Sequence, residues 1–167
     1  MKKLNKDNKG FSLVELLVVI AIMVVLVGVL APSLLSNIEK SRVAKDIQNL
    51  DNIAGAIQDA LMDENAYTNQ PTTDAVYDFT SLYTAANVVA DTDTPAAGQF
   101  KASFANKVKE YLPSGGSVTL SSKAVKSGNT IYFKITSTNN IEVWAATNST
   151  AAPTTTSDGS TTFSVTR

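Results

Sequence analysis

The first strong pattern in the chain is an apolar run from Phe11 to Ala31, in which Glu15 is the only ionisable side chain. As a helix, this run would be about 31 Å long at about 1.5 Å per residue. That length matches the hydrocarbon thickness of a bilayer. Lysines dominate the charge of the preceding residues, and the positive-inside bias would hold that end in the cytoplasm. The pattern therefore predicts a membrane-spanning helix with the rest of the chain outside.

The same apolar run is compatible with three ordinary kinds of segment. A secretory signal peptide is the first and would be cleaved near Ala31, but Pro32 follows directly and is a poor context for that cut. A plain single-pass anchor is the second. A buried core helix is the third, and the flanking lysines argue against it. None of them accounts for Glu15, because a carboxylate inside a membrane span costs about 3 kcal/mol and usually has a partner and a role.

Beyond Pro32 the continuous apolar run becomes a stripe. Apolar residues recur at alternating spacings of four and three, which defines one face of a helix: Val43, Ile47, Leu50, Ala54, Ile57 and Leu61. The charged side chains, Asp46 among them, mostly fall off this stripe. The pattern predicts one helix from about Ser12 to about Met62, whose amphipathic second half needs a globular domain to cover it.

One turn of this helix is predicted to be weak. Pro32 cannot donate a backbone hydrogen bond to the carbonyl of Gly28, and its ring crowds the same turn. Gly28 also lowers the helix propensity there. We expect a kink or local melting between these two residues, although a simple bend at the membrane edge explains the proline nearly as well.

The remainder of the chain predicts a small α+β domain. Residues 63–99 are polar and irregular, with apolar positions that suit a short helix or strand. A second amphipathic helix is predicted over Phe100–Tyr111. Four strands follow from short alternating segments and turn signals: Ser117–Leu120, Thr130–Thr136, Ile141–Thr147 and Thr161–Thr166. The expected fold is a long N-terminal α-helix packed on an antiparallel β-sheet of about four strands, with a polar loop over Thr147–Thr162.

Composition removes several classes of function. The net charge of -1 gives no reason for non-specific nucleic-acid binding by the whole chain. The absence of cysteine excludes disulfides, thiol nucleophiles and cysteine metal sites. The absence of histidine removes the commonest general base and transition-metal ligand. With no catalytic constellation in view, we predict no cofactor and a protein that is not an enzyme.

The segment from Lys9 to Ile22 reads KGFSLVELLVVIAI. It resembles the class III signal of type IV prepilins and pseudopilins, and Pro32 falls where many pilins have a helix-kinking proline. The resemblance implies that a membrane aspartyl peptidase, the prepilin peptidase, cuts between Gly10 and Phe11. It also implies that the same enzyme methylates the new amine of Phe11. Glu15 then becomes the fifth residue of the mature chain.

The physical chemistry of such a cut is coherent. It removes the basic leader and keeps the apolar helix, so the product stays in the membrane. The new ammonium at Phe11 sits at a helix N-terminus, where the helix dipole disfavours it. Glu15 of the same helix is one candidate partner. The resemblance favours Glu15 of a neighbouring subunit, whose pairing would set the stagger of subunits in an apolar filament core, where an unpaired charge is expensive.

The resemblance also implies an organisation and partners. The expected segments are a leader (1–10), a transmembrane or filament-core helix half (11–32), an amphipathic half (33–62), a region with the second helix (63–116), and the sheet with the C-terminal region (117–167). The implied partners are copies of the chain in a helical filament, the prepilin peptidase, the inner-membrane assembly platform, and the membrane before assembly. The expected locations are the cytoplasmic membrane and then an extracellular pilus.

The favoured function is a structural, major pilin of a type IV pilus with roles such as adhesion, twitching motility or DNA uptake. The alternatives are a pseudopilin of a type II secretion system, a competence pilin, and a monomeric membrane-tethered binding domain, against which Glu15 argues. The mature length and the lack of a convincing calcium loop favour a pilin. The lack of cysteine departs from many Gram-negative pilins and favours a Gram-positive or otherwise disulfide-free one.

Two other surface features are weaker candidates. Lys101, Lys107 and Lys109 would form a local basic patch for nucleic acid, although a solvated helix face explains them better. Asn148-Ser149-Thr150 matches an N-glycosylation sequon, a match that also arises by chance.

Two pairs of loop carboxylates would offer oxygens to a calcium ion. They are Asp91 with Asp93 and Asp74 with Asp78. Carboxylates in polar loops are more often simply solvated, so we predict no metal site.

Overall fold

The computed structural model describes residues 11–113, 118–125, 128–156, 159 and 161–167. The predicted leader, residues 1–10 with Gly10, lies outside the described residues. Two compact units make up the chain, Met1–Lys40 and Ser41–Arg167. The helix α1 (Leu13–Ala60) contributes residues to both.

α1 is the predicted long helix, with bounds close to those expected. It has 48 residues, and Pro32 lies inside it. In the second unit its apolar stripe is covered, and its fully buried members have 0% exposure: Leu50, Ile53, Ala54, Ile57 and Ala60. Val43, Ile47 and Leu61 pack at the margin of this core. The spacing of apolar residues therefore identified the face of α1 that the head domain covers.

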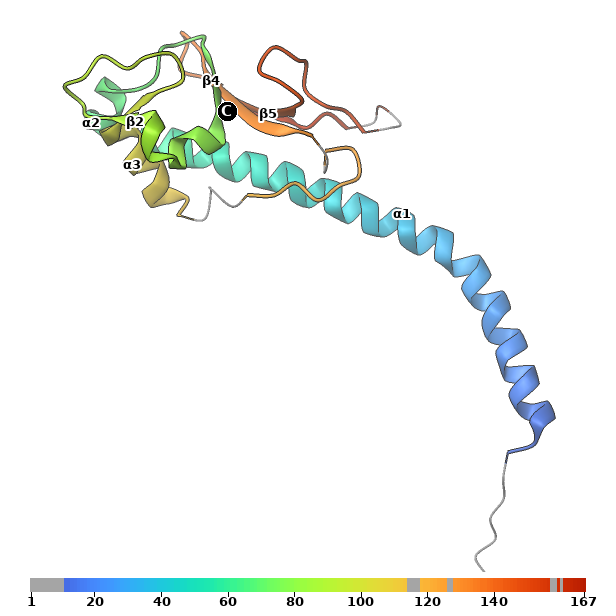
Figure 1. Cartoon of the computed structure of the whole chain (residues 1–167). Helices are drawn as coiled ribbons and strands as arrows, with labels where there is room; N and C mark the ends of the chain where they lie inside the picture. Colours follow the sequence, from blue (N-terminus) through green and yellow to red (C-terminus); the bar gives the residue numbers. More distant parts are fainter. Residues whose placement is uncertain (1–10, 114–117, 126–127, 157–158, 160) are drawn as a thin grey trace, which may run out of the picture. The chain divides into compact units, whose positions relative to one another are not determined.

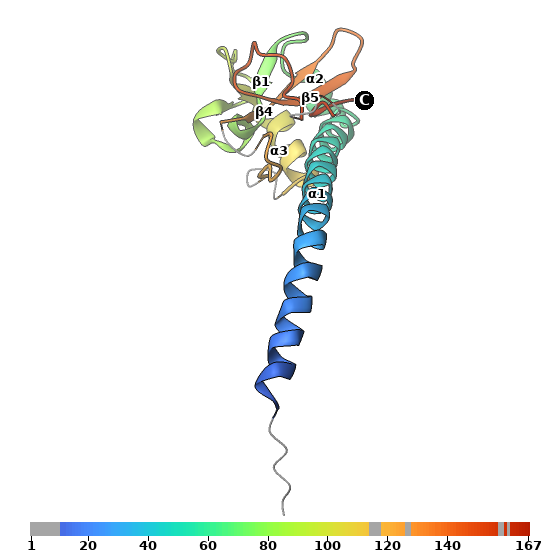
Figure 2. The same cartoon turned by 90° about the vertical axis from the view of Figure 1, so that its right-hand side faces the viewer.

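A four-stranded antiparallel sheet packs against this stripe, so the predicted α+β fold is confirmed. In spatial order the strands are β1 (Val76–Asp78), β4 (Thr130–Ile135), β5 (Ile141–Ala146) and β6 (Ser164–Thr166). Successive side chains of a strand point to opposite faces, and on β4 this alternation buries Ile131, Phe133 and Ile135, as predicted. Figures 1 and 2 show β5 beside the cyan-to-teal part of α1.

The first strand of the sheet is not where the sequence predicted it. Residues 118–120 of the predicted strand Ser117–Leu120 form no strand, and Ser117 lies outside the described residues. β1 takes the edge position instead and pairs with β4, with Tyr77 opposite Phe133. Tyr77 packs its ring against Phe133 and Phe100 at centroid distances of 5.6 and 5.1 Å. The segment Ser117–Leu120 has no aromatic side chain that could replace these contacts.

Asp46 was predicted to lie off the buried stripe, yet it is 0% exposed. Its carboxylate accepts the N–H of Ser121 at 2.9 and 3.0 Å, the hydroxyl of Ser121 at 3.1 Å and the N–H of Ser122 at 2.7 Å. These bonds offset the cost of burying a charge. They also fasten the segment 118–125 to α1, which explains why this segment does not join the sheet.

Shorter elements connect α1 to β4. They are α2 (Glu64–Thr68), two 3-10 helices, η1 (Phe79–Tyr83) and η2 (Ala85–Asn87), then β2 (Val88–Val89), β3 (Phe100–Lys101) and α3 (Ala102–Tyr111). α3 is the predicted second helix. It begins after Phe100 and Lys101 because these two residues pair in parallel with β2. Asp91, from the loop between β2 and β3, caps α3 by accepting the N–H of Ser103 at 2.9 Å.

The stretch predicted as a polar loop, Thr147–Thr162, folds back on the sheet. The N–H of Thr154 donates to the carbonyl of Ala145 at 2.8 Å, and Thr155 forms an antiparallel bridge with Thr162. After β6, the Arg167 guanidinium donates two hydrogen bonds to the Asp51 carboxylate at 2.8 and 2.7 Å. Hydrogen bonds and an ion pair therefore hold the C-terminal region of a chain that has no cysteine.

Asp46→Ala should destabilise the head by about 2–4 kcal/mol, because it leaves the buried N–H of Ser122 and the neighbouring N–H of Ser121 without an acceptor. The measurement is denaturant unfolding of the full chain in detergent, followed by the fluorescence of Trp144, the single tryptophan. Asp59→Ala is the matched control on an exposed position of α1, with an expected change within about 0.5 kcal/mol. Equal unfolding midpoints for the two variants would contradict the role assigned to Asp46.

The Asp51–Arg167 pair makes head stability depend on pH. The hydrogen bond from Arg167 lowers the pKa of Asp51 below its ordinary value of 3.8, with the Arg167 charge adding to the effect and partial burial opposing it. A carboxyl group whose pKa is lower in the folded state stabilises the fold above the unfolded pKa, and this contribution is lost as the pH falls below it.

Asp51→Asn should therefore lower the free energy of unfolding by up to about 1 kcal/mol, the range of surface ion pairs, near neutral pH. The difference from the unmodified chain should shrink as the pH falls below about 4. Urea unfolding across this pH range checks the prediction. In an Arg167→Gln background, Asp51→Asn should have no further effect.

Candidate functional site

The first unit presents an apolar surface with one carboxylate at its start. Every large apolar side chain from Phe11 to Ile38 is at least 40% exposed. Among the described residues, α1 is the one helix long and apolar enough to cross a membrane. This surface is consistent with anchoring in a membrane before any assembly.

Glu15 lies in the first turn of α1 and caps that helix. Its Oε2 accepts the N–H of Ser12 at 2.9 Å, and α1 begins at the next residue, Leu13. Serine followed three positions later by glutamate is the spacing of a capping box, in which the glutamate bonds back to the N-cap N–H. Within the same helix the sequence predicted the amine of Phe11 as the partner of Glu15, whereas the structure shows the N–H of Ser12 in that role.

The capping bond leaves part of the carboxylate available. Within the described part of the chain, Oε1 of Glu15 has no hydrogen-bond partner, and Phe11 is 93% exposed. Gly10, on the other side of the predicted cleavage bond, lies outside the described residues. The geometry thus places a partly engaged carboxylate one turn from the predicted new N-terminus.

Gly28 and Pro32 both lie inside α1, which runs without interruption from Leu13 to Ala60. A Cβ atom added at Gly28 would have no other atom within 4 Å, so packing within the described chain does not require glycine there. Pro32 is exposed. The kink expected between these two residues stays a prediction.

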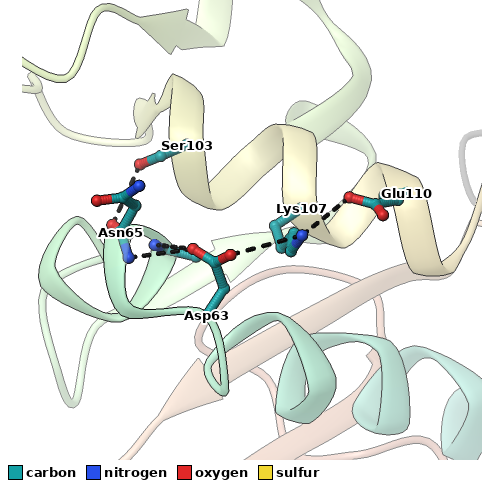
Figure 3. Close-up of polar contacts among 6 residues, drawn as sticks. Asp63, Asn65, Ser103, Lys107 and Glu110 are labelled. Carbon is teal, nitrogen blue, oxygen red and sulfur yellow. Dashed lines mark hydrogen bonds and ion pairs between the residues drawn. The ribbon is translucent and has the colours of Figure 1, made fainter.

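The three lysines proposed as a basic patch each make contacts within the head. Lys107 Nζ lies 3.5 Å from Asp63 Oδ2 and 3.1 Å from Glu110 Oε2 (Figure 3). The hydrogen bond to Glu110 raises the pKa of Lys107. Lys101 Nζ donates to the carbonyl of Asp91 at 2.9 Å, and Lys109 Nζ lies 5.8 Å from the ring centroid of Tyr83. Their charges therefore serve the packing of α3 and its neighbours.

Two of the carboxylates considered for calcium have structural partners. Asp78 accepts the N–H and the hydroxyl of Thr80 at 2.8 and 2.7 Å and so caps η1. Asp91 accepts both the N–H and the hydroxyl of Ser103 at 2.9 Å. Among the described residues no group of three or more His, Cys, Asp or Glu side chains could hold a metal ion.

Comparison with known proteins adds one match. Residues 5–31 match the family described as "Prokaryotic N-terminal methylation motif". No curated protein and no solved structure matches the chain. The match confirms the resemblance noted over Lys9–Ile22 and indicates a structural protein and not an enzyme. By family inference it implies processing by a prepilin peptidase and assembly into a filament.

Proposed function

We propose that this chain, which carries the N-terminal methylation motif typical of the type IV pilin and pseudopilin superfamily, is the major subunit of an extracellular type IV pilus. The observation that supports this most is the exposed apolar half of α1 with Glu15 at its start. Such a surface needs an apolar environment. Lipid supplies that environment before assembly, and copies of the same helix supply it afterwards.

The contact between copies is heterologous in this proposal. The apolar half of one α1 packs on a different part of the same half in the next subunit. A heterologous contact that does not close into a ring builds an open helical filament. The inner-membrane assembly platform would pass each subunit from the cytoplasmic membrane into the base of this filament.

Glu15 would register the subunits in two steps. In the single chain its Oε2 binds the N–H of Ser12 and fixes the first turn of the helix. After cleavage between Gly10 and Phe11, its free Oε1 would accept a hydrogen bond from the methylated ammonium of Phe11 of a neighbouring subunit. In an apolar core neither charge can remain unpaired cheaply, so the pairing sets the stagger between helices.

The turn from Gly28 to Pro32 would allow α1 to adapt during packing. Pro32 removes one hydrogen bond of the helix ladder, and the open space around Gly28 leaves room for a neighbouring helix. Local lengthening at this turn would let subunits in the filament core adjust their spacing.

A major pilin is favoured over a pseudopilin of a type II secretion system or a competence pilin. Asp78 and Asp91 already serve as helix caps, which does not favour the calcium loop that some pseudopilins have. The contacts of Lys101, Lys107 and Lys109 give no support to nucleic acid as the main partner. The lack of cysteine fits a Gram-positive or otherwise disulfide-free pilin.

Two substitutions at Glu15 separate its charge from its capping bond. Glu15→Gln keeps an oxygen that can accept the Ser12 N–H but removes the negative charge, and Glu15→Ala removes both. We expect both variants to lose surface filaments by at least about tenfold, the effect of about 1.4 kcal/mol on an equilibrium. Electron microscopy of cells and immunoblots of membranes check this, because leader-free subunit should accumulate in the membrane.

The control for these variants is Asp59→Asn, which removes one negative charge from an exposed position of the head and should leave filaments intact. Normal filaments with Glu15→Gln would mean that the capping bond suffices and the intersubunit charge pair is wrong. Normal filaments with Glu15→Ala would overturn both roles.

Processing provides an independent test. N-terminal mass spectrometry of the filament subunit should find a chain that begins at methylated Phe11. Gly10→Lys should block the cut and leave the precursor in the membrane without filaments. Asn8→Ala, a change within the leader that keeps Gly10, should be processed normally. Cleavage after Ala31, or filaments built from subunits with an intact leader, would contradict the proposal.

A further inference from the structure

We propose that Asn148 is an N-glycosylation acceptor, which receives a glycan on its carboxamide nitrogen Nδ2. The glycan would be added to the head domain after export. This inference depends on the proposed function only through that export. It concerns a loop that lies outside the matched residues 5–31.

The sequence offers a single position for this modification. Asn148-Ser149-Thr150 has the spacing of the sequon, with an asparagine, a residue other than proline, and a serine or threonine. No other asparagine of the chain has a serine or threonine two positions later. Asparagine-linked sugars occur on surface loops of exported proteins, and this segment follows directly after β5 of the head.

The structure presents the three residues as an exposed turn. Asn148, Ser149 and Thr150 are all exposed. The Asn148 Oδ1 atom accepts the N–H of Thr150 at 3.0 Å and its hydroxyl at 2.9 Å. The hydroxyl required by the motif is therefore in direct contact with the carboxamide that would be modified.

These two bonds also orient the reactive nitrogen. The carboxamide is planar, so fixing Oδ1 towards Thr150 turns Nδ2 away from Thr150. Within the described part of the chain, Nδ2 has no hydrogen-bond partner. Adding a sugar there would break no contact made by the described residues.

The β-sheet holds the residues on both sides of this turn. Ala145 and Ala146 at the end of β5 have 0% exposure. On the other side of the turn, the N–H of Thr154 donates to the carbonyl of Ala145 at 2.8 Å. The hydroxyl of Thr154 also donates to Oδ1 of Asn129 at 2.5 Å. The sheet thus holds both ends of a short loop and presents Asn148 outward without any unfolding of the head.

The transfer balances without an oxidant or reductant. The donor is a sugar linked through its anomeric carbon to a lipid pyrophosphate. A bond forms between Nδ2 and the anomeric carbon, and the bond from that carbon to the pyrophosphate oxygen breaks. The lipid pyrophosphate leaves, and one proton of Nδ2 passes to a base of the transferase.

The test uses subunits sheared from the surface of cells that produce the chain natively. Intact-mass spectrometry should find a mass above that of the processed, methylated chain, and peptide mapping should place the added sugars on Asn148. Asn148→Gln and Thr150→Ala should each lose the whole increment. Thr150→Ser and Ser149→Ala keep the sequon and should retain it.

Asn140→Gln is the matched control, because Asn140 is also exposed but has Glu142 two positions later. It should leave the increment unchanged. A subunit of unmodified mass, or sugars carried by threonines of the loop instead of Asn148, would overturn the inference. Filaments of unglycosylated subunits that begin at Phe11 would contradict this inference and leave the proposed function standing. Glycosylated subunits recovered from the membranes of cells without filaments would support this inference and contradict the proposed function.

Discussion

The apolar first half of α1 constrains everything else in this protein, because it has no cover within the described chain. Each large apolar side chain moved from water to an apolar environment contributes about 1.5–3 kcal/mol. With nearly every side chain from Phe11 to Ala31 apolar, the helix half cannot stay in water. Lipid and a bundle of like helices both satisfy it, so transfer from one to the other costs little.

Transfer of the apolar helix half from lipid to a bundle of like helices changes the hydrophobic free energy little. A single ionisable group in this half therefore has a large influence on the transfer. Glu15 is the only ionisable side chain between Phe11 and Ala31. Its bond to the Ser12 N–H gives the carboxylate a partner at its own helix end. In the proposed filament, the same group would distinguish a neighbour in the correct stagger from lipid, which the apolar side chains cannot do.

The head depends on the second half of the same helix, and here the sequence was informative where side chains repeat. The spacing from Val43 to Leu61 identified the buried face, and the alternation on β4 identified its inner side chains, because both depend on local geometry alone. The stretch Thr147–Thr162 was expected to be a plain loop. It returns to the sheet through Thr154, but it has no alternation of apolar and polar residues that would have predicted this pairing.

Other features were not readable because they depend on partners far away in the sequence. Asp46 is buried only because Ser121 and Ser122 bring donors to it, and nothing near Asp46 in the sequence indicates them. β1, and not the predicted strand Ser117–Leu120, occupies the edge of the sheet because the ring of Tyr77 packs against the rings of Phe100 and Phe133. At the candidate site, the Ser12–Glu15 spacing was visible, whereas the pairing between subunits rests on the resemblance alone.

The separation between partners along the chain also bears on how the head folds. Asp46 is 75 residues from Ser121, and Asp51 is 116 residues from Arg167. Domains dominated by such non-local contacts fold slowly, since long loops must close before the contacts form. In the proposed export, the stripe of α1 would cross the membrane before the strands that cover it. During that interval its apolar residues would be open to aggregation, so a chaperone on the far side of the membrane would be an advantage for this chain.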